Sequence, residues 1–167
     1  FASQDSCASY FIESDGVAAV IDPDRSVRKY IQLANNREAV IKFIFLTHFQ
    51  TDFLGGHLEL AESTGARIIT GPCEGSGFQN ECILDGQTFP LGSMTLRAIH
   101  TPGHAPEACC YLLCDETMNP HSLFTGDTLL AGDVGRTDLI LPEGSTAADM
   151  AGQLYDSLFD KIMGLPG

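Results

Sequence analysis

Three clusters of polar side chains in this sequence each follow directly on an apolar stretch. The clusters are residues 47–53 (Thr-His-Phe-Gln-Thr-Asp-Phe), 101–104 (Thr-Pro-Gly-His) and 125–127 (Thr-Gly-Asp). If the apolar stretches are strands of a layered α/β fold, the clusters lie at strand ends, where such folds build their sites. Two imidazoles and one carboxylate brought together there would cover one face of an octahedral Fe(II) ion and leave positions open for substrate and O2. The spacing alone is equally compatible with histidines that only form hydrogen bonds within their loops.

The elements that would position these clusters alternate between strands and helices over the first 70 residues. This β-α-β-α-β order predicts a layered α/β fold. The periods of the apolar residues predict strands at 7–13, 17–21, 41–46 and 66–70, and helices at 26–37 and 54–63, the second helix ending at Gly65.

From about residue 83 the pattern changes to short strands separated by sharp turns. A last helix begins at Thr146, where Thr146 and Asp149 form a capping box. We expect one domain over residues 1–167 that continues past Gly167, because a helix ending there would normally lead into another strand. The short strands are expected at 83–84, 88–91, 94–100, 108–114 and 122–125.

The composition excludes several classes of partner. The 167 residues include 44% hydrophobic and 19% charged residues, and the formal net charge is −13. A field of that sign repels phosphate backbones and anionic lipid surfaces, so we expect no nucleic-acid partner and no membrane association. Cys109 and Cys110 are adjacent and share an apolar run with Cys114, which favours reduced thiols. We therefore predict a cytoplasmic protein, or a mitochondrial matrix protein if a transit peptide has been removed.

The polar clusters together resemble the motifs of the metallo-β-lactamase superfamily. The motifs are Thr47-His48-x-x-x-Asp52 followed by Gly55-Gly-His57, then residues 100–104 (His-Thr-Pro-Gly-His), then residues 123–128 (Leu-Phe-Thr-Gly-Asp-Thr). The stretches 7–10, 132–139 and 153–158 resemble more narrowly the persulfide dioxygenase branch, whose members are often fused to rhodanese domains. The resemblance implies an αββα sandwich with a metal site at one edge of its two sheets.

The resemblance also implies which residues hold the metal. The iron ligands of the persulfide dioxygenase branch correspond to His48, His104 and Asp127, so one Fe(II) per chain is expected, with zinc as the alternative. The two-metal hydrolases of the superfamily read His-x-His-x-Asp-His in the first motif. Here Gln50 and Phe53 replace two of those ligands, so neither position of a hydrolytic metal pair is complete.

Four further residues are expected to support the ligands without binding the metal. Asp52 is favoured as a hydrogen-bond partner that orients a ligand histidine, and Gln50 occupies a position that tunes the site. His57 is expected to have a structural role, such as bonding the first motif loop. His100, which precedes the Thr-Pro-Gly turn, is expected either to support a ligand or to be a buried hydrogen-bonding group.

Arg136 is a candidate for substrate binding, because a guanidinium can hold a carboxylate through two hydrogen bonds. An ion pair with Asp133 or Asp138 that only fixes the loop has equal weight.

The leading hypothesis is a mononuclear non-haem iron dioxygenase that oxidises glutathione persulfide, or another thiol persulfide, to sulfite and thiol. Its partners would be that persulfide and O2, and the resemblance allows a homodimer and a fused or separate rhodanese domain. Two alternatives stay open. One is a zinc thioester hydrolase of the glyoxalase II type, and the other is a non-catalytic member kept for binding.

Overall fold

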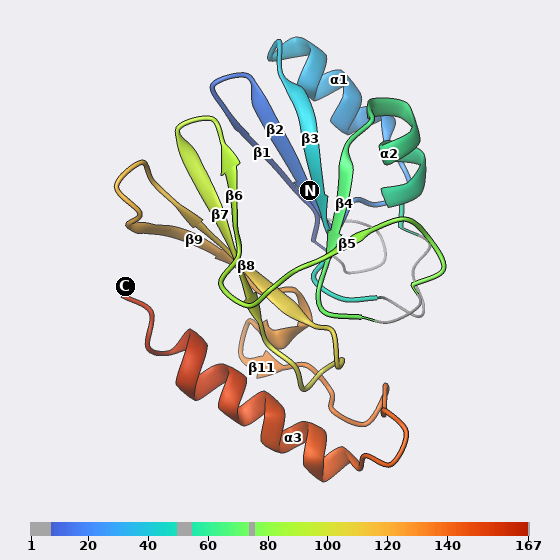
Figure 1. Cartoon of the computed structure of the whole chain (residues 1–167), viewed down its shortest axis with the longest axis vertical. Coiled ribbons are helices and arrows are strands. Elements are labelled where there is room, and N and C mark those ends of the chain that lie inside the picture. Colours follow the sequence, from blue (N-terminus) through green and yellow to red (C-terminus); the bar gives the residue numbers. More distant parts are fainter. Residues whose placement is uncertain (1–7, 50–54, 74–75, 167) are drawn as a thin grey trace.

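The computed structural model describes residues 8–49, 55–73 and 76–166, and two β-sheets facing one another form its centre (Figure 1). In the first sheet β1 pairs antiparallel with β2, and β2 to β5 run parallel. Its strands are β1 (Tyr10–Ser14), β2 (Val17–Ile21), β3 (Val40–Phe45), β4 (Arg67–Thr70) and β5 (Glu81–Cys82).

The second sheet is an antiparallel meander in the order β6-β7-β8-β9. Its strands are β6 (Thr88–Leu91), β7 (Met94–His100), β8 (Cys109–Cys114) and β9 (Pro120–Phe124). A 3-10 turn, Gly126–Thr128, then leads into a small hairpin of β10 (Leu129–Leu130) and β11 (Asp133–Val134).

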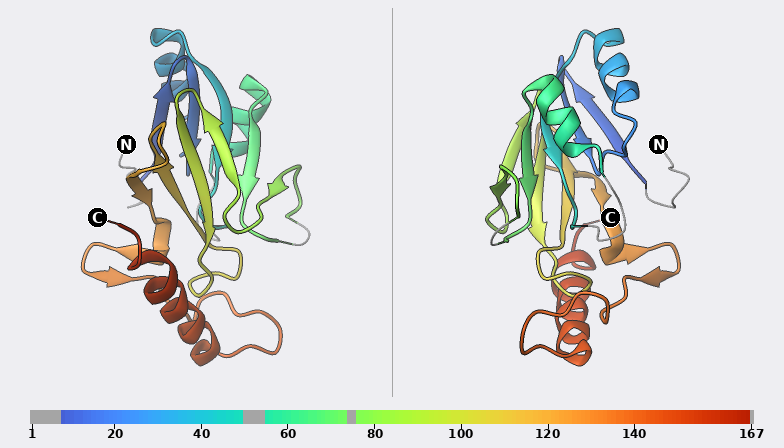
Figure 2. Two further views of the ribbon diagram at one scale, coloured as in Figure 1. Left: turned by 60° about the vertical axis from the view of Figure 1, so that its left-hand side comes forward. Right: turned by 90° about the vertical axis from the view of Figure 1, so that its right-hand side faces the viewer.

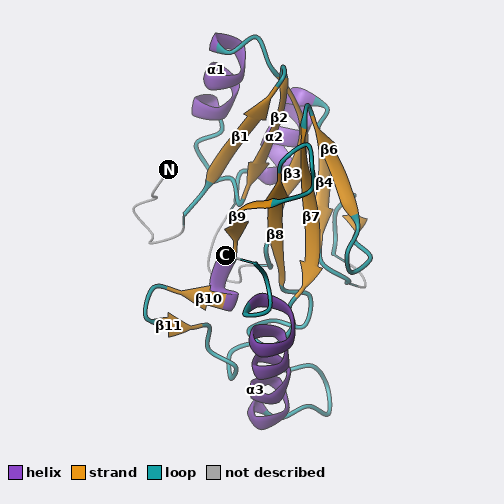
Figure 3. Cartoon of the chain, turned by 90° about the vertical axis from the view of Figure 1, so that its left-hand side faces the viewer, coloured by secondary structure: helices purple, strands orange, loops and turns teal. Residues whose placement is uncertain are grey.

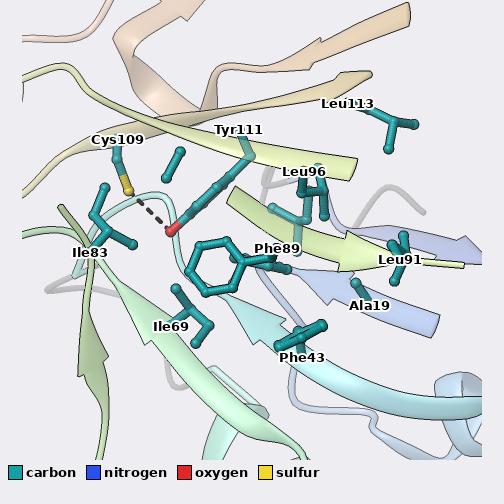
Figure 4. Packing of buried hydrophobic residues seen from close by; sticks show 13 residues of the cluster. Ala19, Phe43, Ile69, Ile83, Phe89, Leu91, Leu96, Cys109, Tyr111 and Leu113 are labelled. Carbon is teal, nitrogen blue, oxygen red and sulfur yellow. Dashed lines mark hydrogen bonds between the residues drawn. The ribbon is translucent and has the colours of Figure 1, made fainter. Parts of the chain in front are cut away.

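The main core lies between the two sheets, and alternation along each strand explains its composition. On β8 the residues Cys109, Tyr111 and Leu113 point into this core, whereas Cys110 and Leu112 belong to a cluster on the outer face. Figure 4 shows Tyr111 reaching across the interface with its hydroxyl beside Cys109. That hydroxyl donates to the carbonyl of Leu46 at 2.8 Å, which satisfies the one polar group in the aromatic packing drawn there.

Two helices cover the outer face of the first sheet, α1 (Arg28–Asn36) and α2 (His57–Thr64). Tyr30 and Ala34 of α1 and Leu60 of α2 are buried against that face, so β2 and β3 are apolar on both sides. The left-handed Gly65 (φ 72°) ends α2, as the sequence predicts.

The last helix, α3 (Ala147–Asp156), continues as a π-helical segment, Ser157–Ile162, and lies beyond one end of the sandwich (Figures 2 and 3). The predicted capping box of Thr146 and Asp149 is present. The helix meets the loop after β7 at close range, because a Cβ on Gly103 would lie 2.4 Å from the Cα of Leu154. Ser157 Oγ also donates to the carbonyl of Pro102 at 2.8 Å, so α3 supports the loop that carries His104.

The predicted αββα layering is confirmed, since α1 and α2 cover the first sheet and Ile162, after α3, packs on the outer face of the second. Several element boundaries differ from the predicted ones by one to three residues, as in the two cases that follow. The strand expected at 83–84 is β5, which lies two residues earlier and pairs with β4 of the first sheet. Ile83 is apolar because its side chain fills the core between the sheets. The described part of α2 begins at His57, since the carbonyl of Gly56 accepts the first bond from Leu60. Among the described residues no helix is both long and apolar enough to cross a bilayer.

Candidate metal centre

His48, His104 and Asp127 lie together at one end of the sandwich, on three different connections. His48 follows β3, His104 lies in the loop between β7 and β8, and Asp127 lies in the 3-10 turn after β9. One ligand atom from each residue lies within 4.8 Å of those of the others. Nε2 of His104 is 3.7 Å from Oδ2 of Asp127, and the two imidazole rings are 4.9 Å apart at 84°. Among the described residues this is the only such group of three metal-ligating side chains.

The tautomer of His104 is fixed by a backbone contact. Its Nδ1 lies 2.9 Å from the carbonyl oxygen of Arg136, which can only accept, so Nδ1 carries the proton. Nε2 is then left with a lone pair facing Asp127. This is the arrangement in which a ligand histidine is oriented by a partner on its other nitrogen.

His48 is oriented by a relay that begins at Asp22. The backbone N–H and the hydroxyl of Thr47 both donate to the Asp22 carboxylate at 2.8 Å. Because the hydroxyl donates its only proton to Asp22, its oxygen accepts a hydrogen bond from Nδ1 of His48 at 3.0 Å. Burial, with the neighbouring His104 adding to it and Asp127 opposing, lowers the pKa of His48 to about 4. His48 is therefore neutral near pH 7, with the Nε2 lone pair available.

This donor set fits a divalent transition metal. Two imidazoles, each bonded to the protein through Nδ1, and one carboxylate make three ligands, which leaves coordination positions open. Both histidines are buried, at 7% and 6% exposure, whereas the Asp127 side chain is 44% exposed, so the open positions face the solvent side. The same three ligands suit Fe(II) and Zn(II).

Two glycines let the three connections approach this closely. A Cβ on Gly135 would lie 2.2 Å from the carbonyl oxygen of Asp127 and 2.8 Å from the His104 ring. A Cβ on Gly126 (φ 49°) would lie 2.3 Å from the hydroxyl oxygen of Thr47. Gly135 therefore packs directly against two of the candidate ligands.

Further backbone contacts tie the His48 loop to the His104 loop. The Glu107 carboxylate accepts from the N–H of Phe49 at 2.8 Å, and the N–H of Cys109 donates to the carbonyl of Thr47 at 2.8 Å. Glu107 is 8% exposed, so its charge is used inside the protein to hold the residue after His48. These contacts fix the separation of the two imidazoles.

The residues expected to support the ligands differ in the contacts that they form. His100 is half-buried, and its Nε2 lies 2.9 Å from the carbonyl oxygen of Pro106, so the ring contacts the loop that carries His104. His57 packs on Phe78 at 4.9 Å between ring centroids, and Phe78 packs on Phe49. Residues 50–53 of the first motif loop, to which a bond from His57 was expected, lie outside the described residues. Gln50, Asp52 and Phe53 lie outside the described residues.

Arg136 contributes to the site through its backbone. Its carbonyl orients His104, while its guanidinium forms two hydrogen bonds to the carboxylate of Asp138, at 3.0 and 2.8 Å. This is one of the two loop-fixing ion pairs that the sequence left open. The side chain is 67% exposed, so a substrate carboxylate could reach it only in competition with Asp138.

The sequence reading missed Asp22, Glu107 and Gly135. The signal for Asp22 was its position at the end of a buried strand, before Pro23, and its φ of 46° confirms a special backbone there. Gly135 and Glu107 act through contacts with residues far away in the chain, which no local pattern reveals.

The stability of the metal-free protein should respond to pH through Asp22 and His48 with opposite signs. Burial raises the pKa of Asp22 to about 7, although the two hydrogen bonds from Thr47 act in the opposite direction. The free energy of unfolding therefore falls as pH rises from about 4 to 7 and the buried carboxyl loses its proton. The lowered pKa of His48 costs stability as pH falls from 6.5 to about 4. The difference in unfolding free energy between Asp22→Asn and the natural protein should therefore grow in favour of the variant by about 2 kcal/mol as pH rises from about 4.5 to 6.5.

Urea denaturation at several pH values measures this difference. His48→Asn is the matched control, since its difference from the natural protein must have the opposite slope. Parallel pH profiles for all three proteins would contradict the burial of these two groups.

Comparison with known proteins agrees with this geometry. The sequence profile of the Metallo-beta-lactamase superfamily matches residues 2–166. Hydroxyacylglutathione hydrolase from Rhodospirillum rubrum is 33% identical over 153 residues, which cover 90% of this chain and 54% of that protein. This chain spans about half the length of the curated relatives it matches.

Two solved structures match nearly the whole chain. A metallo-beta-lactamase from Staphylococcus aureus has a TM-score of 0.84 and 31% identity, covering 96% of this chain and 49% of that one. ETHE1 from Myxococcus xanthus has a TM-score of 0.82 and 30% identity, covering 99% of this chain and 69% of that one. The three polar clusters, the two facing sheets and these matches agree that the chain belongs to the metallo-β-lactamase superfamily.

Proposed function

We propose that this chain carries a mononuclear Fe(II) centre that oxidises the persulfide of a small thiol, such as glutathione persulfide. The reaction balances as RSSH + O2 + H2O → RSH + SO3²⁻ + 2H⁺. The observation that carries the proposal is the group of two histidines and one carboxylate, with both Nδ1 atoms already bonded to the protein. Iron held there would supply adjacent open positions for the persulfide sulfur and for O2.

The residues of this chain have three tasks in that reaction. His48, His104 and Asp127 hold the metal, with Thr47 and the Arg136 carbonyl fixing the two rings. The carboxylate of Asp127 offsets part of the metal charge. An anionic substrate must enter against a net charge of −13, so a local cation is needed, and Arg136 is the candidate.

A zinc-dependent thioester hydrolase is the second candidate, and the hydroxyacylglutathione hydrolase relative favours it. A two-metal mechanism would need further nitrogen ligands in the first motif. The sequence has Gln50 and Phe53 at those positions, and a neutral amide and a phenyl ring do not replace imidazoles. This favours the one-metal reaction. A rhodanese partner, a homodimer and the cellular location stay predictions.

Oxygen uptake with a persulfide tests the proposed reaction. The protein at the full length its gene encodes is loaded anaerobically with Fe(II), and its metal content is verified before persulfides of several thiols are added. We expect oxygen consumption with matching release of sulfite and no cleavage of S-lactoylglutathione. Thioester cleavage by the zinc-loaded protein, with a flat oxygen trace for the iron-loaded one, would establish the hydrolase instead.

Arg136→Ala should discriminate between the two roles of that side chain. If the guanidinium binds a substrate carboxylate, KM for glutathione persulfide should rise about tenfold, while a persulfide without carboxylates is little affected. Arg136→Lys should recover only part of the loss, because an ammonium lacks the planar fork. Equal losses on both substrates would mean that the pair with Asp138 only fixes the loop.

Gln50→His tests whether the reaction depends on the histidine that Gln50 replaces in the first motif. If the triad acts alone, the natural protein should already consume oxygen, and the variant should change the rate by no more than ~10–100-fold, as expected for a group outside the ligand set. Thioester cleavage should not appear in the variant, because Phe53 still occupies a second ligand position. A variant that gains thioester cleavage would contradict the one-metal account.

A further inference from the structure

Two cysteines outside the metal centre lie with their sulfur atoms almost in contact. Cys73 follows β4 and Cys82 ends β5, and their Sγ atoms are 3.2 Å apart. Neither forms a disulfide. Cys73 is half-buried and Cys82 is exposed, so one sulfur is supported by the protein and the other faces solvent. A disulfide needs about 2.05 Å, so the sulfurs must close by about 1 Å, which is within reach of a χ1 adjustment.

Polar groups surround both sulfurs. The side-chain nitrogen of Asn80 donates to Sγ of Cys73 and to Sγ of Cys82, each at 3.5 Å. The hydroxyl oxygen of Thr70 is 3.5 Å from Cys73 Sγ and 3.9 Å from Cys82 Sγ, and it accepts from Asn80 at 2.6 Å. Donors aimed at a sulfur stabilise a thiolate.

These contacts shift the pKa values of the two thiols in opposite directions. Desolvation opposes ionisation of Cys82, but bonds from Cys73, Thr70 and Asn80 outweigh it and lower the pKa of Cys82. Desolvation raises the pKa of Cys73. The exposed sulfur is thus the better thiolate, and the half-buried sulfur keeps its proton until a disulfide forms beside it.

The other described cysteines have the opposite environment. Cys109, Cys110 and Cys114 are buried among apolar residues at 0–1% exposure. Burial raises the pKa of the Cys109 and Cys110 thiols. All three thiols therefore lack the access that thiol–disulfide exchange requires, and Cys109 and Cys110 also resist ionisation.

We propose that Cys82 and Cys73 form a redox-active dithiol that reacts with disulfides of small thiols. The Cys82 thiolate attacks one sulfur of a disulfide RSSR, forming a mixed disulfide and releasing RS⁻. Cys73 then loses its proton and attacks Sγ of Cys82, which releases the second RS⁻ and leaves the Cys73–Cys82 disulfide. The protein loses two electrons and the one S–H proton of Cys73 in this exchange, and the small disulfide is reduced to two thiolates, one of which takes up that proton.

The loop between these cysteines also contacts the residue that follows His48. Phe78 packs on Phe49, the residue after His48, at 5.9 Å between ring centroids. Cys82 is itself exposed, so a small disulfide can approach it from solvent, and Asn80, which donates to both sulfurs, also lines a groove of about 590 Å³ between α2 and β4. The proposed exchange does not depend on the metal or on the proposed oxygenase activity.

The test is exchange with bis(2-hydroxyethyl) disulfide, an uncharged probe that the acidic protein does not repel. The full-length protein carries Cys7→Ser, and mass spectrometry with peptide mapping follows the reaction. We expect a loss of two hydrogens confined to the peptides of Cys73 and Cys82. Cys73→Ser should stop at a mixed disulfide on Cys82, and Cys82→Ser should react at least about tenfold more slowly.

Two further variants keep the test independent of folding. Asn80→Asp replaces a donor by a negative charge at nearly the same shape, and should slow exchange about tenfold while both cysteines remain. Cys114→Ala, at a buried thiol, should react like the parent protein. Cys82→Ser reacting as fast as the parent, or a Cys73→Ser variant without a mixed disulfide, would overturn the proposal.

Discussion

Replacing either His104 or Asp127 by alanine is expected to empty the metal centre. Each residue supplies one of three ligand atoms that lie within 4.8 Å of one another, so its loss leaves two ligands. Two ligands on an otherwise open site should weaken metal binding by at least about a hundredfold, more than the loss of an orienting partner costs. Oxygen uptake should disappear with the metal. Elemental analysis after gel filtration measures the loss directly.

The matched control is His121→Ala. His121 is exposed on β9, its Nδ1 lies 2.9 Å from the hydroxyl of Ser122, and it is outside the group of three ligand atoms. This variant removes one imidazole of the same kind and should keep its metal. His57→Ala should keep it as well, since His57 packs on Phe78. Full metal content in the His104→Ala protein would exclude this site.

Gly135→Ala should have the second largest effect, although it changes no ligand. The added methyl carbon would lie 2.2 Å from the carbonyl of Asp127 and 2.8 Å from Cγ and Nδ1 of His104. These atoms cannot move away without rotating the His104 ring off the Arg136 carbonyl or displacing the Asp127 backbone. We expect metal affinity to fall by ~10–100-fold, the cost of disturbing the groups that orient ligands.

Gly152→Ala is the control for that substitution. Gly152 lies in α3, and nothing would come within 4 Å of its Cβ. Alanine there should stabilise the helix by up to ~1 kcal/mol and leave the metal content unchanged. Isothermal titration with Fe(II) or Zn(II) compares the two variants. Equal affinity in both would mean that the His104 loop is not held against Gly135.

The clusters at the strand ends could be located from sequence, because apolar periodicity marks the strands and polar residues follow them. His48, His104 and Asp127 could be named through motif resemblance, and the structure brings them together. The strand at 108–114 could also be predicted, and β8 is buried along its whole length. The resemblance could not indicate that the Arg136 guanidinium bonds Asp138 while its carbonyl bonds His104.

The remaining errors come from contacts between distant segments. Ile83 was assigned to a strand because it is apolar, but it is apolar because its side chain lies in the core. The residues that pair with β4 are Glu81 and Cys82. Asp22 acts on His48 through Thr47 across 25 residues of sequence. Such pairings follow from the register of β2 on β3, which a single sequence does not specify.

The number of metal ions per chain tests the central claim most directly. The full-length protein is reconstituted anaerobically with Fe(II), and in parallel with Zn(II), freed of unbound ions and analysed for metal and protein together. One triad of His48, His104 and Asp127, with Gln50 and Phe53 in the first motif, predicts about one ion per chain for either metal. Two tightly bound zinc ions per chain would contradict the single-metal centre and favour the zinc-dependent thioester hydrolase instead.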